Sequence, residues 1–117
     1  MMHTDLDVWK TAIDLAVEIY ATTEKLPREE RYGLAAQMRR AASSISSNIS
    51  EGAARDTKRD MRRFFFIARG SLKEVETQII ICNRLSFLPP SDISRIEALS
   101  AKTGKLLNGL IRRYRDG

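Results

Sequence analysis

The chain has 117 residues, a mass of 13.3 kDa and a formal net charge of +5, with a sequence pI near 9.7. This length is typical of one domain, and 43% apolar with 30% charged residues favours a soluble globular protein over a disordered or membrane-spanning one. No apolar run is long enough for a transmembrane helix, no signal-peptide pattern is visible, and a single cysteine excludes an internal disulfide. We therefore expect one domain over residues 1–117, in the cytoplasm.

The residue types present in the sequence exclude most kinds of catalytic site. The only histidine is His3, so neither a histidine–cysteine metal cluster nor a nucleophile with a histidine base is expected. No glycine-rich phosphate loop of the Walker or dinucleotide type is present. Glu51, Glu74 and Glu76 lack the histidines that a di-iron bundle site needs. We expect a protein that is not an enzyme and has no cofactor or metal.

The charge is distributed unevenly along the chain. Residues 1–30 carry a net charge of −4, residues 31–73 carry +7 and residues 74–117 carry +2. A basic middle third predicts contact with a polyanion, nucleic acid first. The alternative is that the acidic first third faces the basic middle of a neighbouring copy.

The first predicted helix covers residues 5–25, where apolar side chains recur every three or four positions. Thr4 or Asp5 can cap it, and Pro27 stops it. The stripe predicted to face the core is Trp9, Ala12, Ile13, Ala16, Ile19, Tyr20 and Thr23. Its aromatic members, with Tyr32, are expected in the core or an interface rather than stacked on nucleic-acid bases.

The second predicted helix covers residues 29–54 and ends near Gly52. Its centre is rich in alanine and serine, which are small enough to let another helix approach closely. The polar face formed by Ser44, Ser47, Asn48 and Glu51 resembles an active site superficially but contains no base. We interpret it as close helix packing in which hydroxyls bond to backbone carbonyls.

The third predicted helix covers residues 57–87, with Thr57 or Asp56 as its cap. Its predicted core stripe is Met61, Phe64, Phe65, Ala68, Leu72, Val75, Ile79, Cys82 and Leu85. The triplets 64–66 and 79–81 each span about 200° of the helix, which is wider than one core-facing stripe. The residues left outside the core, Phe66, Ile80 and Ile81, are therefore predicted to form a subunit interface.

The fourth predicted helix covers residues 91–115, with Ser91 as its cap and Asp92 in its first turn. Its apolar residues repeat at three and four positions up to Tyr114. Four helices joined by short loops predict an all-α fold, an up-down-up-down bundle.

A cluster of basic residues at the start of the third helix is the strongest candidate site. Its members are Arg55, Lys58, Arg59, Arg62, Arg63, Arg69 and Lys73. Arginine suits phosphate because its planar fork donates two parallel hydrogen bonds, and such contacts do not read sequence. The alternative is a solvated face whose cations pair with Asp56 and Asp60.

Arg39 and Arg40 are adjacent in the second helix, so one of them must lie near the core. We predict that it forms a buried or half-buried ion pair with Glu51, Glu74 or Glu76, which fixes the register of the bundle. The other arginine is free to join the basic face. Cys82 is predicted to be a small core residue.

Several runs resemble the four helix bundle protein family, also called 23S rRNA intervening-sequence proteins. The runs are residues 8–10, 19–20, 26–27, 32–34, 37–41, 44–52 and 68–74. The family commonly has proline at the position of Ser46 and alanine at that of Ser50. The resemblance implies a left-handed four-helix bundle in ring-like homo-pentamers. The family is also similar to the accessory protein of diversity-generating retroelements, which binds nucleic acid and a reverse transcriptase.

These observations together predict a non-enzymatic nucleic-acid-binding or accessory protein that acts as a homo-oligomer. Its ligand is RNA or DNA, contacted through phosphates by the basic face, and a protein such as a reverse transcriptase is a further partner implied by the resemblance. The alternative is a protein-interaction scaffold whose basic face recruits an acidic protein. No membrane partner is expected.

Overall fold

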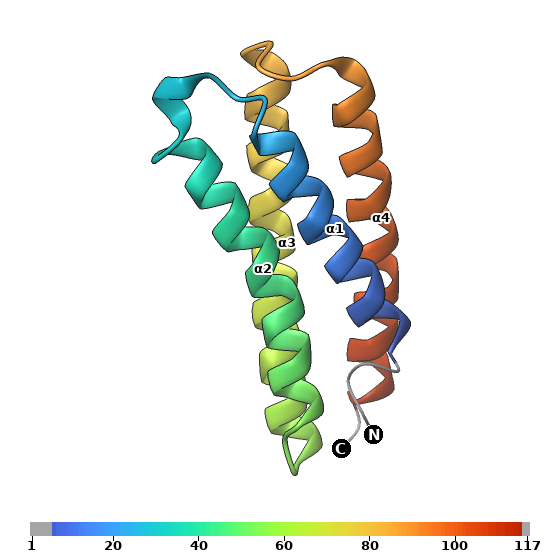
Figure 1. The fold of residues 1–117 in the computed structure, drawn as a ribbon. Coiled ribbons are helices and arrows are strands. Elements are labelled where there is room, and N and C mark those ends of the chain that lie inside the picture. Colours follow the sequence, from blue (N-terminus) through green and yellow to red (C-terminus); the bar gives the residue numbers. More distant parts are fainter. Residues whose placement is uncertain (1–5, 116–117) are drawn as a thin grey trace.

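The computed structural model describes residues 6–115, and four α-helices packed together contain most of them (Figure 1). The helices are α1 (Asp7–Thr23), α2 (Leu34–Ala53), α3 (Lys58–Arg84) and α4 (Pro90–Arg113), with a short 3-10 helix η2 (Arg28–Glu30) between α1 and α2. No strand occurs within residues 6–115. The predicted all-α class and the four helices are confirmed.

The connections between helices lie at the two ends of an elongated molecule of 45 × 24 × 20 Å. Figure 1 shows the α1–α2 and α3–α4 connections at one end and the short α2–α3 turn at the other. Helix α1 packs against α2 and α4, and α3 packs against α2 and α4, with α2 and α3 in the most extensive contact. The 27 residues of α3 run about 40 Å, which is nearly the full length.

The second helix begins later than predicted. Pro27 is followed by the 3-10 turn of η2, and α2 starts only at Leu34. Gly33 lies outside the usual helical and extended regions, with φ −105° and ψ −105°, and breaks the helical path. The Leu34 amide is satisfied by the Glu30 side chain at 3.3 Å. From there α2 runs without interruption through Ser46.

The caps of the other helices are partly as predicted. The Thr57 hydroxyl accepts from the Asp60 amide at 3.1 Å, which confirms that cap of α3. Pro89 is the N-cap of α4 and Pro90 its first residue, so the predicted Ser91 cap is wrong. The N-cap of α1 is Leu6, and the predicted caps at residues 4 and 5 lie outside the described residues.

Helix α3 ends at Arg84, three residues earlier than predicted, in a hydrogen-bonded reversal. Ser86 adopts the left-handed conformation with φ 56°. The Phe87 amide donates to the Cys82 carbonyl at 3.0 Å, and the Ser86 amide donates to that of Asn83 at 3.1 Å. This pair of bonds is a Schellman motif, which satisfies carbonyls that the helix end would leave unpaired.

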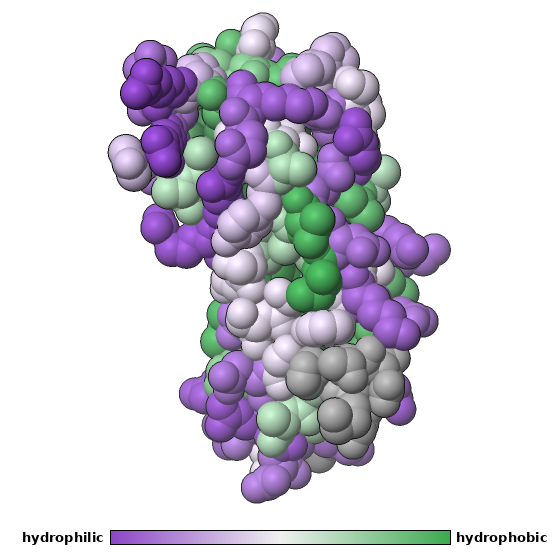
Figure 2. All heavy atoms as spheres, viewed as in Figure 1, coloured by the Kyte–Doolittle hydropathy of each residue, from purple (hydrophilic) through white to green (hydrophobic). Residues whose placement is uncertain are grey.

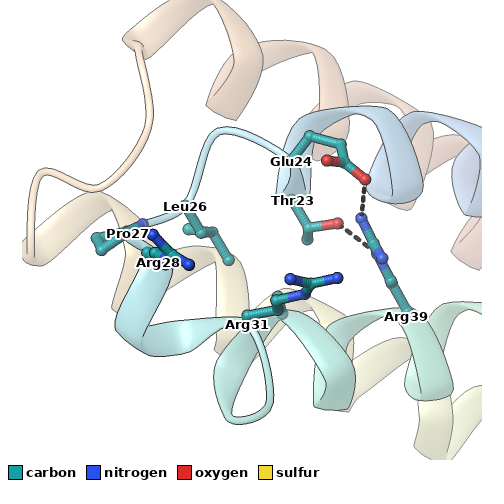
Figure 3. A pocket seen from close by; sticks show the side chains of 8 residues that line it. Thr23, Glu24, Leu26, Pro27, Arg28, Arg31 and Arg39 are labelled. Atoms are coloured by element: carbon teal, nitrogen blue, oxygen red, sulfur yellow. Dashed lines mark hydrogen bonds and ion pairs between the residues drawn. The ribbon is translucent and has the colours of Figure 1, made fainter.

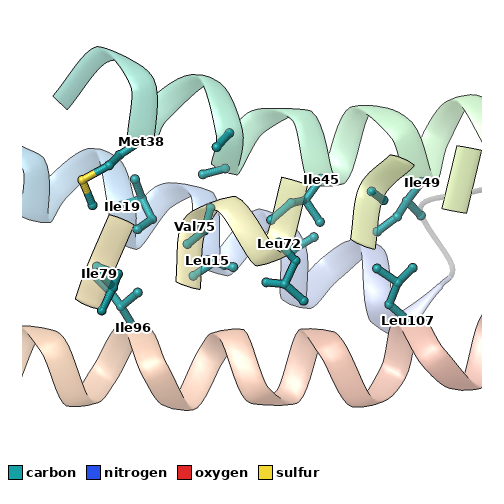
Figure 4. Close-up of a cluster of buried hydrophobic side chains, with 14 of the residues drawn as sticks. Leu15, Ile19, Met38, Ile45, Ile49, Leu72, Val75, Ile79, Ile96 and Leu107 are labelled. Atoms are coloured by element: carbon teal, nitrogen blue, oxygen red, sulfur yellow. The ribbon is translucent and has the colours of Figure 1, made fainter. Parts of the chain in front are cut away.

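The core runs the length of the bundle, with all four helices contributing (Figure 4). The predicted apolar repeat of α4 is mostly buried, and Cys82 is fully buried as predicted. The stripe of α1 is rotated toward Val8 and Leu15, because α1 packs between α2 and α4. Leu85 is 55% exposed, so its predicted core position is wrong. Tyr20 is 47% exposed, so of its two predicted places, the core or an interface, it does not occupy the core.

Helices α2 and α3 approach closely at Gly52. A Cβ atom there would lie 2.6 Å from Cε1 of Phe65 and 3.0 Å from the Met61 carbonyl. Further along, the Ser44 and Ser71 hydroxyls bond to each other across the two helices at 2.9 Å. The Ser43 and Ser46 hydroxyls bond to backbone carbonyls within α2. The predicted close packing therefore holds at Ser44, but its hydroxyl bonds to a side chain of α3 and not to a backbone carbonyl as predicted. Ser47 and Glu51, the outer members of the same predicted face, are exposed.

Hydrophilic and hydrophobic side chains gather on different parts of the surface. In the view of Figure 2, hydrophilic side chains crowd the end with the α1–α2 connection, and a hydrophobic strip lies over α1. Val17 of α1 is 63% exposed. Across residues 6–115, no helix is both long and apolar enough to cross a bilayer.

Candidate nucleic-acid interface

The basic residues at the α2–α3 turn and the first turns of α3 form a compact group, here called the α3 basic cluster. It consists of Arg55, Lys58, Arg59, Arg62 and Arg63. Four of these side chains are exposed and Arg62 is half-buried. The turn over residues 54–57 places Arg55 beside the start of α3, because α2 and α3 meet there. The structure therefore brings together five of the seven predicted residues.

Aromatic rings hold several of these guanidinium groups in place. The guanidinium carbons of Arg55 and Arg63 lie 4.5 and 5.0 Å from the centre of the Phe64 ring. Phe64 is half-buried, so it supports both cations while they remain open to solvent. Arg55 also pairs with Glu51 at 2.6 Å, one helical turn earlier.

Arg62 has a structural role that the sequence did not reveal. Its Nη1 atom donates to the backbone carbonyls of Tyr114 and Arg115, the former at 2.8 Å. Arg62 therefore ties the start of α3 to the end of α4. Together with Arg59, Arg63 and Phe66 it lines a surface recess of about 560 Å³.

The remaining two predicted residues are engaged elsewhere. Arg69 lies 4.7 Å from the centre of the Phe66 ring and donates to Asn108 Oδ1 of α4 at 3.1 Å. Lys73 pairs with Glu76 at 3.3 Å. The seven predicted residues therefore do not form one uniform solvated face. Among the seven, those without a carboxylate partner within residues 6–115 are Lys58, Arg59, Arg62, Arg63 and Arg69. The alternative, in which these cations pair with Asp56 and Asp60, is not seen among the ion pairs of the described residues.

The ion pair predicted within α2 has a different partner. Arg39 is half-buried, as expected of one of the two arginines, and Arg40 is exposed. Arg39 bonds to Glu24 at 2.8 Å and to the Thr23 hydroxyl at 2.9 Å, both at the end of α1. The predicted partners Glu51, Glu74 and Glu76 are thus wrong, because Arg39 faces α1 and not α3. Glu51 pairs with Arg55 instead, and Gln78 donates weakly to Glu74 at 3.5 Å.

The residues predicted to form a subunit interface are exposed. Phe66, Ile80 and Ile81 keep 43, 54 and 41% of their surface accessible. Ile67 of α3 and Leu85 just after it are exposed as well, and the predicted core position of Leu85 had missed this. Trp9 is half-buried and donates to Ser50 at 3.0 Å, whereas Tyr32 is 86% exposed, so its predicted packing is not seen within this chain.

Two features of the structure had no signal in the sequence patterns. Arg28, Arg31 and Arg39 share one recess beside the α1–α2 connection, here called the arginine recess. Asp92 is buried and pairs with Lys25 and Arg95. The recess and the Asp92–Lys25 pair join residues of separate helices or loops, so periodicity within one segment cannot find them. Within the described residues, no group of histidine, cysteine and carboxylate side chains is placed to hold a metal ion.

Burial, and to a smaller extent the negative charge of Glu30, disfavour the thiolate and together raise the pKa of the Cys82 thiol to about 11. The thiol lies 3.7 Å from the Met38 sulfur in the core. A neutral, buried thiol is unreactive, so Cys82 is a packing residue and not a nucleophile.

Comparison with known proteins identifies the class to which this fold and surface belong. The profile of the 23S rRNA-intervening sequence protein family matches residues 4–109. The chain belongs to this family, as the resemblance indicated.

A solved structure supports the fold. The crystal structure of a protein of unknown function from the S23 ribosomal protein family of Bacteroides thetaiotaomicron superposes with a TM-score of 0.82. The two sequences are 24% identical, and the match covers 89% of this chain and 97% of the other. Among curated proteins, none matches this sequence.

Proposed function

We propose that the protein is a non-enzymatic nucleic-acid-binding protein that contacts phosphates through the α3 basic cluster. The observation that carries this proposal is the absence of carboxylate partners for Lys58, Arg59 and Arg63, all exposed, within residues 6–115. Unpaired cations gathered at one end of a helix attract phosphate, and they bind without reading sequence.

The rings of Phe64 and Phe66 add to this proposal. They lie against Arg55, Arg63 and Arg69, which limits the freedom of those guanidinium groups before any ligand arrives. Arg62 contributes less to binding than the sequence suggested, because its donors already serve carbonyls at the end of α4.

The proposed functional unit is a homo-oligomer, a ring of up-down-up-down left-handed bundles. The exposed apolar side chains Phe66, Ile80 and Ile81 support a contact between copies. Several copies of a weak phosphate site on one particle multiply its affinity through avidity. The pentameric stoichiometry rests on the resemblance.

The test is the affinity for a short single-stranded RNA, measured by fluorescence anisotropy between about 50 and 200 mM salt. The double variant Arg59→Gln/Arg63→Gln should weaken binding about tenfold and reduce the slope of log K against log salt by about one to two. The matched control is Lys102→Gln/Lys105→Gln, which removes the same charge from exposed positions of α4.

Equal losses of RNA affinity in the two double variants would overturn the assignment of the binding site. They would show that the affinity depends on net charge and not on the α3 basic cluster. Absence of binding at low salt would overturn the nucleic-acid role itself. The protein-scaffold alternative then predicts a stoichiometric acidic protein partner that dissociates from the Arg59→Gln/Arg63→Gln variant.

A further inference from the structure

The arginine recess lies at the end of the bundle opposite the α3 basic cluster (Figures 1 and 3). It has a volume of about 400 Å³, within the range of small-molecule sites. Its polar wall comes from Thr23, Glu24, Arg28, Arg31 and Arg39, while Leu26, Pro27 and Ala35 provide an apolar floor. Three separate segments therefore build one concave surface: the end of α1, the η2 connection and the first turns of α2.

Arg39 is fixed in position at one side of this recess. Its Nε atom donates to the Thr23 hydroxyl at 2.9 Å, and its Nη2 atom donates to Glu24 at 2.8 Å and to the Tyr20 carbonyl at 3.2 Å. The Thr23 hydroxyl in turn donates to the Ile19 carbonyl at 2.7 Å. Because these bonds use Nε and Nη2, the Nη1 group of Arg39 is left without a hydrogen bond within residues 6–115.

Arg28 and Arg31 enter the same space without a counterion. Figure 3 shows the Arg31 side chain extending toward Thr23 and Arg39, with Arg28 near Leu26. Neither forms an ion pair with a carboxylate of the described chain. The Arg31 guanidinium carbon lies 5.4 Å from the centre of the exposed Tyr32 ring. Glu24 is the single acid that lines the recess, so two positive charges there are uncompensated.

We infer that the arginine recess binds a phosphate group with two negative charges, carried by a small organic molecule. Two uncompensated guanidinium charges match a phosphate dianion, and the arginine fork bonds two phosphate oxygens at once. Ala35 belongs to the first turn of α2, so the positive end of that helix dipole adds to the attraction. The apolar floor accommodates the organic part. This inference is independent of the proposed RNA contact, which uses other residues at the other end of the molecule.

The test titrates inorganic pyrophosphate, AMP and adenosine into the full-length ¹⁵N-labelled protein, followed by NMR. We expect saturable shifts of the Arg31 and Arg39 side-chain Nε signals and of backbone amides in residues 23–39, with pyrophosphate and AMP but not adenosine. Arg31→Gln should weaken the binding of pyrophosphate and of AMP about tenfold, as the loss of one charged contact predicts. Arg40→Gln, which removes the same charge from an exposed neighbour outside the recess, should stay within about twofold of the parent.

A phosphate with two negative charges also exists at the 5′ end of an RNA. A second experiment therefore distinguishes a small phosphorylated molecule from a 5′-phosphorylated RNA as the ligand. In the Arg59→Gln/Arg63→Gln background, a 5′-phosphorylated RNA is compared with its 5′-hydroxyl form. Binding of AMP without a difference between the RNAs identifies a small molecule, whereas a preference for the phosphorylated RNA without binding of AMP overturns the small-molecule assignment. Shifts confined to residues 55–73, or an equal loss in Arg31→Gln and Arg40→Gln, would overturn the site while leaving the proposed function intact.

Discussion

The Oδ2 atom of Asp92 lies 2.8 Å from the Nζ atom of Lys25, so an acid in the first turn of α4 holds the segment that follows α1. Arg95 donates to the other Asp92 oxygen at 3.1 Å and to Glu18 of α1 at 2.7 Å. The Asp92 side chain is 2% exposed, whereas Lys25 and Arg95 are exposed. This network ties the α1–α2 connection, and with it the arginine recess, to α4.

Asp92→Asn should lower the free energy of unfolding by about 2 kcal/mol, because two charge-assisted hydrogen bonds to a buried carboxylate are lost. The exposed cations regain water, which keeps the cost below that of stranding a buried charge. Urea unfolding measures the change, with Glu97→Gln as the control on an exposed acid of the same helix. If both variants unfold at the same urea concentration, the network contributes no stability.

Substituting alanine for Gly52 and for Gly70 should change the free energy of unfolding in opposite directions, although both glycines lie inside helices. Gly52→Ala puts a methyl group 2.6 Å from the Phe65 ring and should cost about 1–3 kcal/mol. At Gly70 the added Cβ meets nothing within 4 Å, so Gly70→Ala should gain about 0.5–1 kcal/mol through helix propensity. Thermal unfolding of both at one protein concentration tests the close approach of α2 and α3. A gain in both variants would contradict it.

Cys82 should make stability fall at alkaline pH. The folded protein holds the thiol pKa at about 11, above its ordinary value of 9.0, so the neutral form is favoured in the folded state. The stabilisation is therefore complete below about pH 9 and is lost as the pH rises through about 11, by about 3 kcal/mol in all.

The measurement is the stability difference between the parent and Cys82→Ala, which cancels the titration of other groups. This difference should shrink as the pH rises above 9. A thiol reagent at neutral pH should label the folded parent slowly and the urea-unfolded chain at once, since only the thiolate reacts. Rapid labelling of the folded protein would show that the thiol is accessible.

The apolar outer face of α3 should control assembly. Ile80→Glu/Ile81→Glu places two charges where a contact between copies is proposed, and it should reduce the particle mass measured by light scattering to that of one chain. Val17→Glu, at an apolar position of α1 that is 63% exposed, should leave the mass unchanged. Helical content followed by circular dichroism separates dissociation from unfolding. A mass that stays the same in the α3 variant would place the contact elsewhere.

How much of the structure could be predicted depended on how far apart in the sequence the interacting residues lie. The cap at Thr57, the burial of Cys82 and the exposure of Phe66, Ile80 and Ile81 follow from patterns within one segment, and the structure has them as expected. The start of α2 was missed because Gly33 and the η2 turn break a helix that periodicity alone would extend. The end of α3 was missed because serine rarely adopts the left-handed conformation seen at Ser86.

The all-α class, the four helices and the basic region at the start of α3 could all be predicted from the amino-acid sequence. These features depend on spacing at 3.6 residues per turn and on local charge, which neighbouring residues already encode. In contrast, helix packing is what pairs Arg39 with Glu24, Arg62 with the end of α4, and Asp92 with Lys25. Those partners come from different helices, and their meeting depends on how the helices rotate about their axes to fill one core.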